Sequence, residues 1–169
     1  TMFMAQARLT RGMHLVGVAD LDVARARSQL GNAGWPDEIY AAGSLAEAHQ
    51  KRTTFVTDNA DALIADPRIE VIVEATGVPG AGIHHALGTI AHGKHIVMVN
   101  VEADTLAGPL LARRAQEAGI VYSLAYGDQP ALICELVDWA RTCGFPVVAA
   151  GRGHKWLPHF SESTPETVW

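Results

Sequence analysis

Cysteine, aromatic residues and charged residues are all scarce in this sequence. Only two cysteines, Cys134 and Cys143, occur among 169 residues. This scarcity argues against a disulfide framework and favours a reducing, cytoplasmic setting, with both thiols free in the core. Charged residues make up 18% of the chain and the formal net charge is −5. Nucleic-acid binding requires a basic face, so we expect no nucleic-acid partner and a small-molecule ligand instead.

Long apolar runs and catalytic motifs are also lacking. No run reaches the roughly 18 apolar residues that a membrane span needs, and the first residues do not resemble a secretory signal. The eight histidines show no H-x-x-x-H or H-E-x-x-H spacing. His84 and His85 are adjacent on a predicted helix and therefore point to different faces. We expect no metal site and no membrane association.

The chain contains an alternation of β-rich runs and longer helical stretches. Apolar and β-branched runs predict strands over residues 14–19, 53–56, 70–74, 94–99, 120–124 and 147–150. Helices are predicted over residues 22–30, 44–51, 60–65, 80–92, 104–118 and 128–142. Strands that alternate with helices in this way indicate βαβ units, and their continuous apolar runs indicate a parallel sheet covered on both faces. The predicted fold is therefore α/β, a Rossmann-type doubly wound parallel sheet.

Both ends of the sequence depart from this pattern. Apolar residues from Met2 to Leu9 predict a helix, and no strand or G-x-G-x-x-G loop precedes it. We therefore expect the first strand and the phosphate-binding loop upstream of Thr1, and weak cofactor binding by residues 1–169 alone. Residues 1–150 are predicted to form an NAD(P)-binding domain that is incomplete at its N-terminus. Residues 151–169 are predicted to begin a substrate or dimerisation region.

Asp20 is the first candidate ligand, because it closes the strand that ends in Leu-Val-Gly-Val-Ala-Asp. A carboxylate at this place can accept both hydroxyls of an adenosine ribose and would repel a 2′-phosphate, which favours NAD over NADP. Nearby Arg25 and Arg27 keep NADP open, because an arginine can hold that phosphate. Alternatively, Asp20 only caps the helix that starts near Asp22.

The ends of two later strands supply further cofactor candidates. Ala75, Thr76 and Gly77 follow the strand over 70–74, and small residues there would let the backbone approach a dinucleotide. A tight turn that needs a glycine is the alternative explanation. Asn100 follows the strand over 94–99, where its amide can hydrogen-bond the nicotinamide ribose or carboxamide.

Three residues are candidates for the substrate side. Glu102 suits a general acid or base, although a glutamate in a first helical turn also stabilises the helix dipole. Asp128 starts a predicted helix and has an N-cap role as its alternative. Lys155 lies in the Gly151-Arg152-Gly153-His154-Lys155 segment and can polarise a carbonyl or donate a proton, or it belongs to a solvated basic loop.

The motifs Val-Glu-Ala-Thr-Gly (73–77), Gly-Lys-His (93–95) and Asn100 resemble the NAD-binding domain of homoserine dehydrogenases. The segments 100–104, 126–132 and 151–158 are similar to homoserine-dehydrogenase-like proteins with a SAF domain. That group includes deoxyxylulose-phosphate reductoisomerase-like enzymes. The resemblance implies Asp20, Thr76, Gly77 and Asn100 as cofactor contacts, and Glu102, Asp128 and Lys155 as substrate-side residues. Homoserine dehydrogenases carry a lysine directly after this asparagine, whereas this sequence has Val101.

Together these observations predict an NAD(P)-dependent oxidoreductase that moves a hydride between nicotinamide and a small polar carbonyl or hydroxyl compound. The full-length protein is expected to form homo-oligomers. A domain that senses nucleotides without catalysis is an alternative, favoured by Val101 in place of the lysine. An adenosylmethionine-dependent transferase is another, because such enzymes also place an acid at the end of their second strand.

Overall fold

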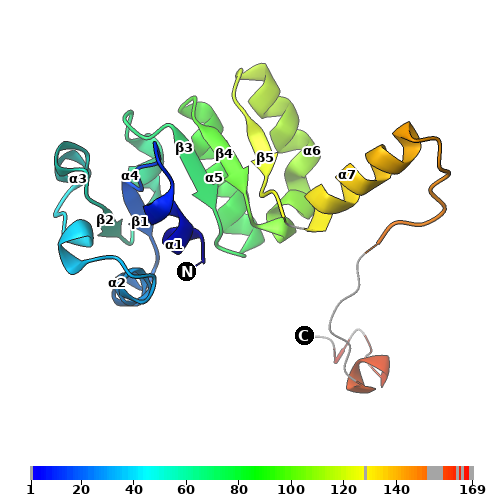
Figure 1. Ribbon diagram of the computed structural model, residues 1–169, viewed down its shortest axis with the longest axis horizontal. Coiled ribbons are helices and arrows are strands. Elements are labelled where there is room, and N and C mark those ends of the chain that lie inside the picture. Colours follow the sequence, from blue (N-terminus) through cyan, green and yellow to red (C-terminus); the bar gives the residue numbers. More distant parts are fainter. Residues whose placement is uncertain (1, 128, 152–157, 163, 165, 168–169) are drawn as a thin grey trace. The chain divides into compact units, whose positions relative to one another are not determined.

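The computed structural model describes residues 2–127, 129–151, 158–162, 164, 166 and 167 (Figure 1). It contains two compact units, Thr1–Ser123 and Leu124–Trp169. In the first unit, helices α1 to α6 alternate with strands β1 to β5. In chain order the elements of this unit are α1 Met2–Leu9, β1 Gly17–Ala19, α2 Val23–Asn32, a 3₁₀ turn Asp37–Tyr40, α3 Leu45–Lys51, β2 Phe55–Thr57, α4 Ala60–Ala65, β3 Val71–Glu74, α5 Pro79–Ala91, β4 His95–Met98, α6 Val101–Glu117 and β5 Tyr122–Leu124, which crosses the boundary. The second unit contains α7 Gln129–Thr142 and a 3₁₀ turn Pro158–Glu162.

The strands form two parallel arrangements. Strands β1 and β2 pair with Gly17 opposite Phe55, and β3 and β4 pair with Val71 opposite His95 and Glu74 opposite Met98. β5 lies on the other side of β4, which gives the order β3-β4-β5. Parallel pairing joined by helices confirms the predicted Rossmann-like α/β fold. It also places the ends of β3 and β4 at one edge of their sheet, as their arrowheads show in Figure 1.

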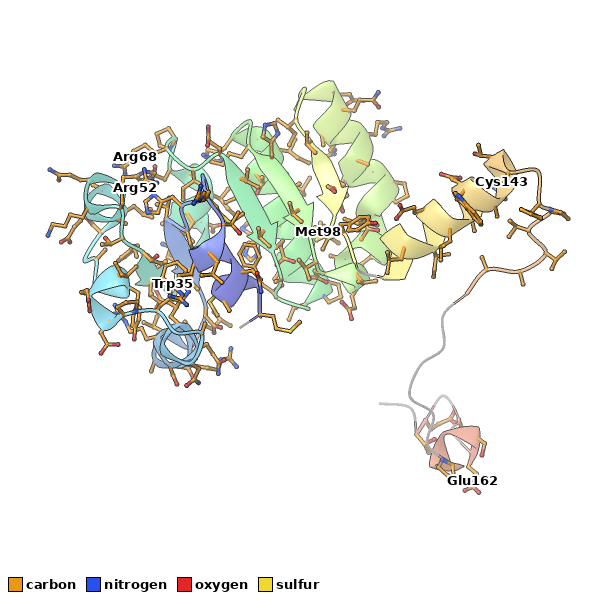
Figure 2. The ribbon with its side chains drawn as sticks, in the orientation of Figure 1. Trp35, Arg52, Arg68, Met98, Cys143 and Glu162 are labelled. Atoms are coloured by element: carbon orange, nitrogen blue, oxygen red, sulfur yellow. The ribbon has the colours of Figure 1, made fainter. Side chains whose placement is uncertain are left out.

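Helices α5 and α6 cover one face of the three-stranded sheet. Ile96 and Met98 point to this face and are 0% and 1% exposed, and Leu111 of α6 is 1% exposed (Figure 2 marks Met98). Side chains of the opposite face alternate with them and are more exposed, with Val71 at 48%, Val73 at 38% and Val121 at 58%. The strand over 70–74 was expected to be buried on both faces, and this expectation is wrong for Val71 and Val73.

A second cluster of buried residues lies around β1, β2 and α2. It includes Leu30, Trp35, Tyr40 and Val56. The indole Nε1 of Trp35 donates a hydrogen bond to the Met4 carbonyl at 2.9 Å. This bond satisfies a largely buried polar group and ties α1, the helix predicted at the start of the chain, to the cluster.

Several sequence predictions about local structure need correction. Residues 147–150 form no strand. Cys134 and Cys143 are free, as expected, but both are exposed rather than in the core. Helix α6 starts at Val101 instead of residue 104, because Asn100 caps it. None of the described helices is both long and apolar enough to cross a membrane.

Candidate functional site

Asn100 connects the carboxyl ends of β3 and β4. It is the N-cap of α6, and its Oδ1 accepts a hydrogen bond from the Ala103 amide at 3.1 Å. Its Nδ2 donates to Thr76 Oγ1 at 3.2 Å and to the Val78 carbonyl at 3.0 Å. The residue is 1% exposed. The amide therefore fixes the turn after β3 to the start of α6, and its predicted direct contact with a cofactor remains a prediction.

The turn formed by Ala75, Thr76 and Gly77 is exposed at the same edge of the sheet. Gly77 has a φ of 72°, a left-handed conformation that glycine adopts without strain. This backbone conformation supports the alternative that the position requires a glycine, and it is compatible with a binding role. An exposed backbone at the carboxyl end of parallel strands is the usual place for a ligand in an open α/β sheet.

Glu74 lies in the Val-Glu-Ala-Thr-Gly segment that the sequence analysis singled out, but the sequence assigned it no role of its own. It is the last residue of β3, is 2% exposed, and its Oε1 accepts from the Thr76 amide at 3.2 Å. The same oxygen lies 3.2 Å from His85 Nδ1 of α5. A carboxylate that ends an otherwise apolar strand was the available signal. Glu74 therefore holds the turn after β3 from inside the domain, opposite to Asn100.

Tyr122 at the start of β5 and Asp104 in the first turn of α6 form a second polar pair. The Tyr122 hydroxyl donates to Asp104 Oδ1 at 2.8 Å. Burial raises the pKa of Tyr122 well above its usual value, and the neighbouring Asp104 carboxylate raises it further. The phenol therefore stays protonated and acts as a donor that anchors α6 on β5.

Asp20 lies directly after β1, as predicted, and its side chain is 30% exposed. Its Oδ1 accepts from the Asp22 amide at 2.9 Å and from Arg25 Nη2 at 2.7 Å. The bond from the Asp22 amide, and then the Arg25 guanidinium, hold the pKa of this carboxyl below its usual range. The N-cap of α2 is Asp22, whose side chain accepts from the Arg25 amide. The cap alternative for Asp20 is therefore wrong, and at the strand end both oxygens of its carboxylate accept from Arg25 Nη2.

The two arginines after Asp20 have different surroundings. Arg25 pairs with Asp20 and its side chain is 62% exposed. Arg27 Nη1 donates instead to the Tyr40 carbonyl at 2.9 Å, in a part-buried position. Arg25 is therefore the arginine close to the predicted ribose position.

The substrate-side candidates are only partly described. Glu102 lies exposed in the first turn of α6, two residues after Asn100. Asp128 and Lys155 lie outside the described residues. The described residues contain no cluster of histidine, cysteine or carboxylate side chains that would suit a metal ion. A shallow depression next to Glu70 and His95 lies at the amino ends of β3 and β4, away from this edge.

Comparison with known protein families finds one matching family for the first unit and another for the second. Residues 2–123 match the family model described as homoserine dehydrogenase, NAD binding domain. Residues 127–169 match the model described as oxidoreductase DRL, catalytic domain. No curated protein matches.

A solved structure of "putative oxidoreductase yvaA" from Bacillus subtilis is similar, with a TM-score of 0.54 and 19% identity over 85% of this chain. This chain spans 36% of the length of that neighbour, and the likeness shows the fold alone. The match over residues 2–123 covers most of the sequence. The chain therefore belongs to the family of homoserine dehydrogenase NAD-binding domains.

Proposed function

We propose that this chain provides the dinucleotide-binding part of an NAD(P)-dependent oxidoreductase. The observation that carries the proposal is the exposed turn of Ala75, Thr76 and Gly77, held at the carboxyl edge of β3 and β4 by Asn100. Membership of an NAD-binding family supports a nicotinamide cofactor. When bound, the cofactor would supply or accept the hydride, and the protein would provide orientation and electrostatics.

In this proposal the residues of the site divide between the two halves of the cofactor. Asp20 would accept the hydroxyls of the adenosine ribose, because its carboxylate is partly exposed at the end of β1. The backbone of Ala75, Thr76 and Gly77 would lie against the nicotinamide half. Glu102 is the described candidate for a contact with the substrate, since it is exposed beside the same edge.

The substrate we propose is a small polar carbonyl or hydroxyl compound, of the kind used by homoserine dehydrogenase-like or deoxyxylulose-phosphate reductoisomerase-like enzymes. The match of residues 127–169 to an oxidoreductase catalytic domain supports an oxidoreductase and does not choose between these two groups. Asp128 and Lys155 are proposed on the substrate side with Glu102. A homo-oligomer of the full-length protein remains part of the proposal.

The test is an assay of NADH and NADPH oxidation by the full-length protein with aldehydes, ketones and sugar phosphates. Turnover of one of these compounds is expected. Tight cofactor binding without turnover of any compound would instead favour a nucleotide sensor. Calorimetry with adenosylmethionine is the second arm, and binding of this ligand in place of NADH would overturn the proposal.

Substitutions at Asp20 and Arg25 test the choice of cofactor. We expect NADH to bind more tightly than NADPH, because the Asp20 carboxylate accepts from ribose hydroxyls and repels a 2′-phosphate. Asp20→Ala is expected to weaken NADH binding roughly tenfold or more, as expected when a charge-assisted hydrogen bond is lost. Arg25→Gln is expected to strengthen NADH binding and weaken NADPH binding, because it removes the cation that competes for Asp20.

Arg27→Gln is the matched control, since the Arg27 guanidinium bonds to the Tyr40 carbonyl instead of Asp20. This variant is expected to leave the ratio of NADH to NADPH affinity unchanged, as measured by fluorescence titration. A wild-type preference for NADPH, or equal changes in Arg25→Gln and Arg27→Gln, would contradict the assignment.

A further inference from the structure

The Glu74 side chain is 1% exposed, and only one of its two carboxylate oxygens has hydrogen-bond partners. Oε1 accepts from the Thr76 amide and faces His85 Nδ1, both at 3.2 Å. Oε2 is buried without a partner. A buried carboxylate with an unpaired oxygen is unfavourable for folding, because it has lost its hydration without a full replacement.

His49 Nε2 and Thr53 Oγ1 are also buried without a partner in the described part of the domain, but they are neutral groups, whereas other buried charged side chains have clear structural roles. Lys94, for example, is 4% exposed, and its Nζ donates to the carbonyls of Asp66 at 2.5 Å and Ile69 at 2.7 Å. Those bonds hold the loop before β3. Packing alone would favour an apolar residue at Glu74, next to the core side chains of β4. The advantage of a carboxylate at this position must therefore come from something other than stability.

The Glu74 carboxylate contacts the exposed turn of the proposed site, at the amide of Thr76. Glu74 Oε1 fixes the Thr76 amide from within the domain, while Asn100 Nδ2 fixes Thr76 Oγ1 and the Val78 carbonyl from the β4 side. His85, at 16% side-chain exposure, sits behind Glu74 on α5 and restricts the orientation of the carboxylate. The turn is thereby held from two strands and one helix while its own residues stay exposed.

We propose that Glu74, oriented by His85, is a positioning residue that holds the Thr76–Gly77 turn in the conformation that receives the nicotinamide half of the cofactor. This inference rests on the proposed function. Glu74 does not touch the cofactor in it and acts through the backbone of Thr76. It follows that the residue is kept for binding at a cost in stability.

Glu74→Met separates positioning from stability. This change removes the unpaired buried oxygen but also leaves the Thr76 amide and His85 Nδ1 without their acceptor, so the two effects on the thermal midpoint oppose each other and only a small net change is expected. NADH is expected to bind about tenfold more weakly, the loss expected for one hydrogen bond to a charged group. The affinity for 5′-AMP, which carries only the adenosine half, should not change. Glu74→Gln retains an oxygen for the Thr76 amide and should restore part of the NADH affinity.

Lys94→Met is the control at the opposite end of the same sheet. It is expected to lower the thermal midpoint and to leave the ratio of NADH to 5′-AMP affinity unchanged. A lower thermal midpoint in Glu74→Met, together with equal fold-losses of NADH and 5′-AMP affinity, would overturn the inference and assign Glu74 a purely structural role. Wild-type NADH affinity in this variant would overturn it as well.

NMR spectra without cofactor distinguish a failure of this inference from a failure of the proposed function. In Glu74→Met the amide resonances of Thr76 and Gly77 and the ring-nitrogen resonances of His85 are expected to shift, and in Lys94→Met they should not. If the full-length wild-type protein binds neither NADH nor 5′-AMP, the proposed function fails, while these shifts still report whether Glu74 holds the turn. Unchanged resonances in Glu74→Met would refute the positioning role.

Discussion

Asp66 shows how strongly one carboxylate can be coupled to its neighbours in this protein. Its side chain is 7% exposed and pairs with Arg68, with Nη2 at 2.5 Å from Oδ2 and Nε at 2.9 Å from Oδ1. The Arg68 amide donates to Oδ1 at 2.9 Å as well. The side-chain bonds from Arg68, despite partial burial, lower the pKa of Asp66 from 3.8 to about 2.

This shift predicts an acid-dependent contribution to stability. Because the pKa is lower in the folded state, the ionised carboxylate stabilises the fold at pH values above 3.8, and the contribution is lost as the pH falls through about 2. Asp66→Asn is expected to lower the free energy of unfolding at neutral pH by about 1 kcal/mol, after allowance for the exposed Arg68. Urea denaturation of both proteins across this pH range measures the difference. A difference that stays constant down to the lowest pH would refute the coupling.

At the level of single residues, the sequence predicted candidates at the strand ends, and the structure shows which side chains they contact. Asp20 was predicted because a carboxylate ends an apolar strand, and the structure places it beside Arg25 and not Arg27. Asn100 was predicted because a polar residue follows an apolar strand there as well. Its side-chain amide forms hydrogen bonds to Thr76, Val78 and Ala103. The role of Glu74 was not predicted, because only the packing of α5 on β3 shows that this residue is buried beside His85.

At the level of elements, the close contact of α5 with α6 depends on Gly82. A Cβ atom at this position would lie 2.5 Å from Asn100 Nδ2 and 2.7 Å from the Ala103 Cβ. Asn100 cannot move away cheaply, because three hydrogen bonds fix its amide. This contact could not be predicted from the sequence, since a glycine inside a predicted helix usually only lowers helix propensity.

Gly82→Ala is therefore expected to destabilise the protein by about 1–3 kcal/mol through overpacking, although alanine is the better helix former. Gly80→Ala in the same helix is the control, because no atom lies within 4 Å of its added Cβ. This second change is expected to be neutral or to stabilise by up to about 1 kcal/mol. Thermal unfolding followed by circular dichroism compares the two, and equal effects would rule out the predicted clash.

At the level of the whole molecule, the described structure covers the three-stranded sheet unequally. Ile96 faces α5 and α6 and is 0% exposed, whereas Val73 on the opposite face is 38% exposed. Continuous apolar strands are typical of parallel sheets that are covered on both faces. The core that stabilises this sheet in the first unit accordingly lies on the side of α5 and α6 (Figure 1).

Two truncations measure this asymmetry. Ile96→Ala is expected to lower the free energy of unfolding by about 2–4 kcal/mol, because it leaves a cavity in the covered face. Val73→Ala is expected to cost about 1 kcal/mol or less, since the valine already contacts solvent. Equilibrium urea unfolding gives both values. A cost for Val73→Ala as large as that for Ile96→Ala would mean that the second face is covered in solution.

The sequence by itself determined the order of the elements, their parallel arrangement and the family. The order and arrangement follow from periodicity and helix caps, and the family follows from the resemblance of its motifs; all of these are local and need no knowledge of distant contacts. Tertiary structure alone decided the start of α6 at the Asn100 cap, the exposure of both cysteines and the absence of a strand at 147–150. It also decided the burial of Glu74 and the choice of Arg25 as the partner of Asp20. Burial and side-chain pairing depend on which elements pack together, and that packing cannot be predicted from any single segment of the sequence.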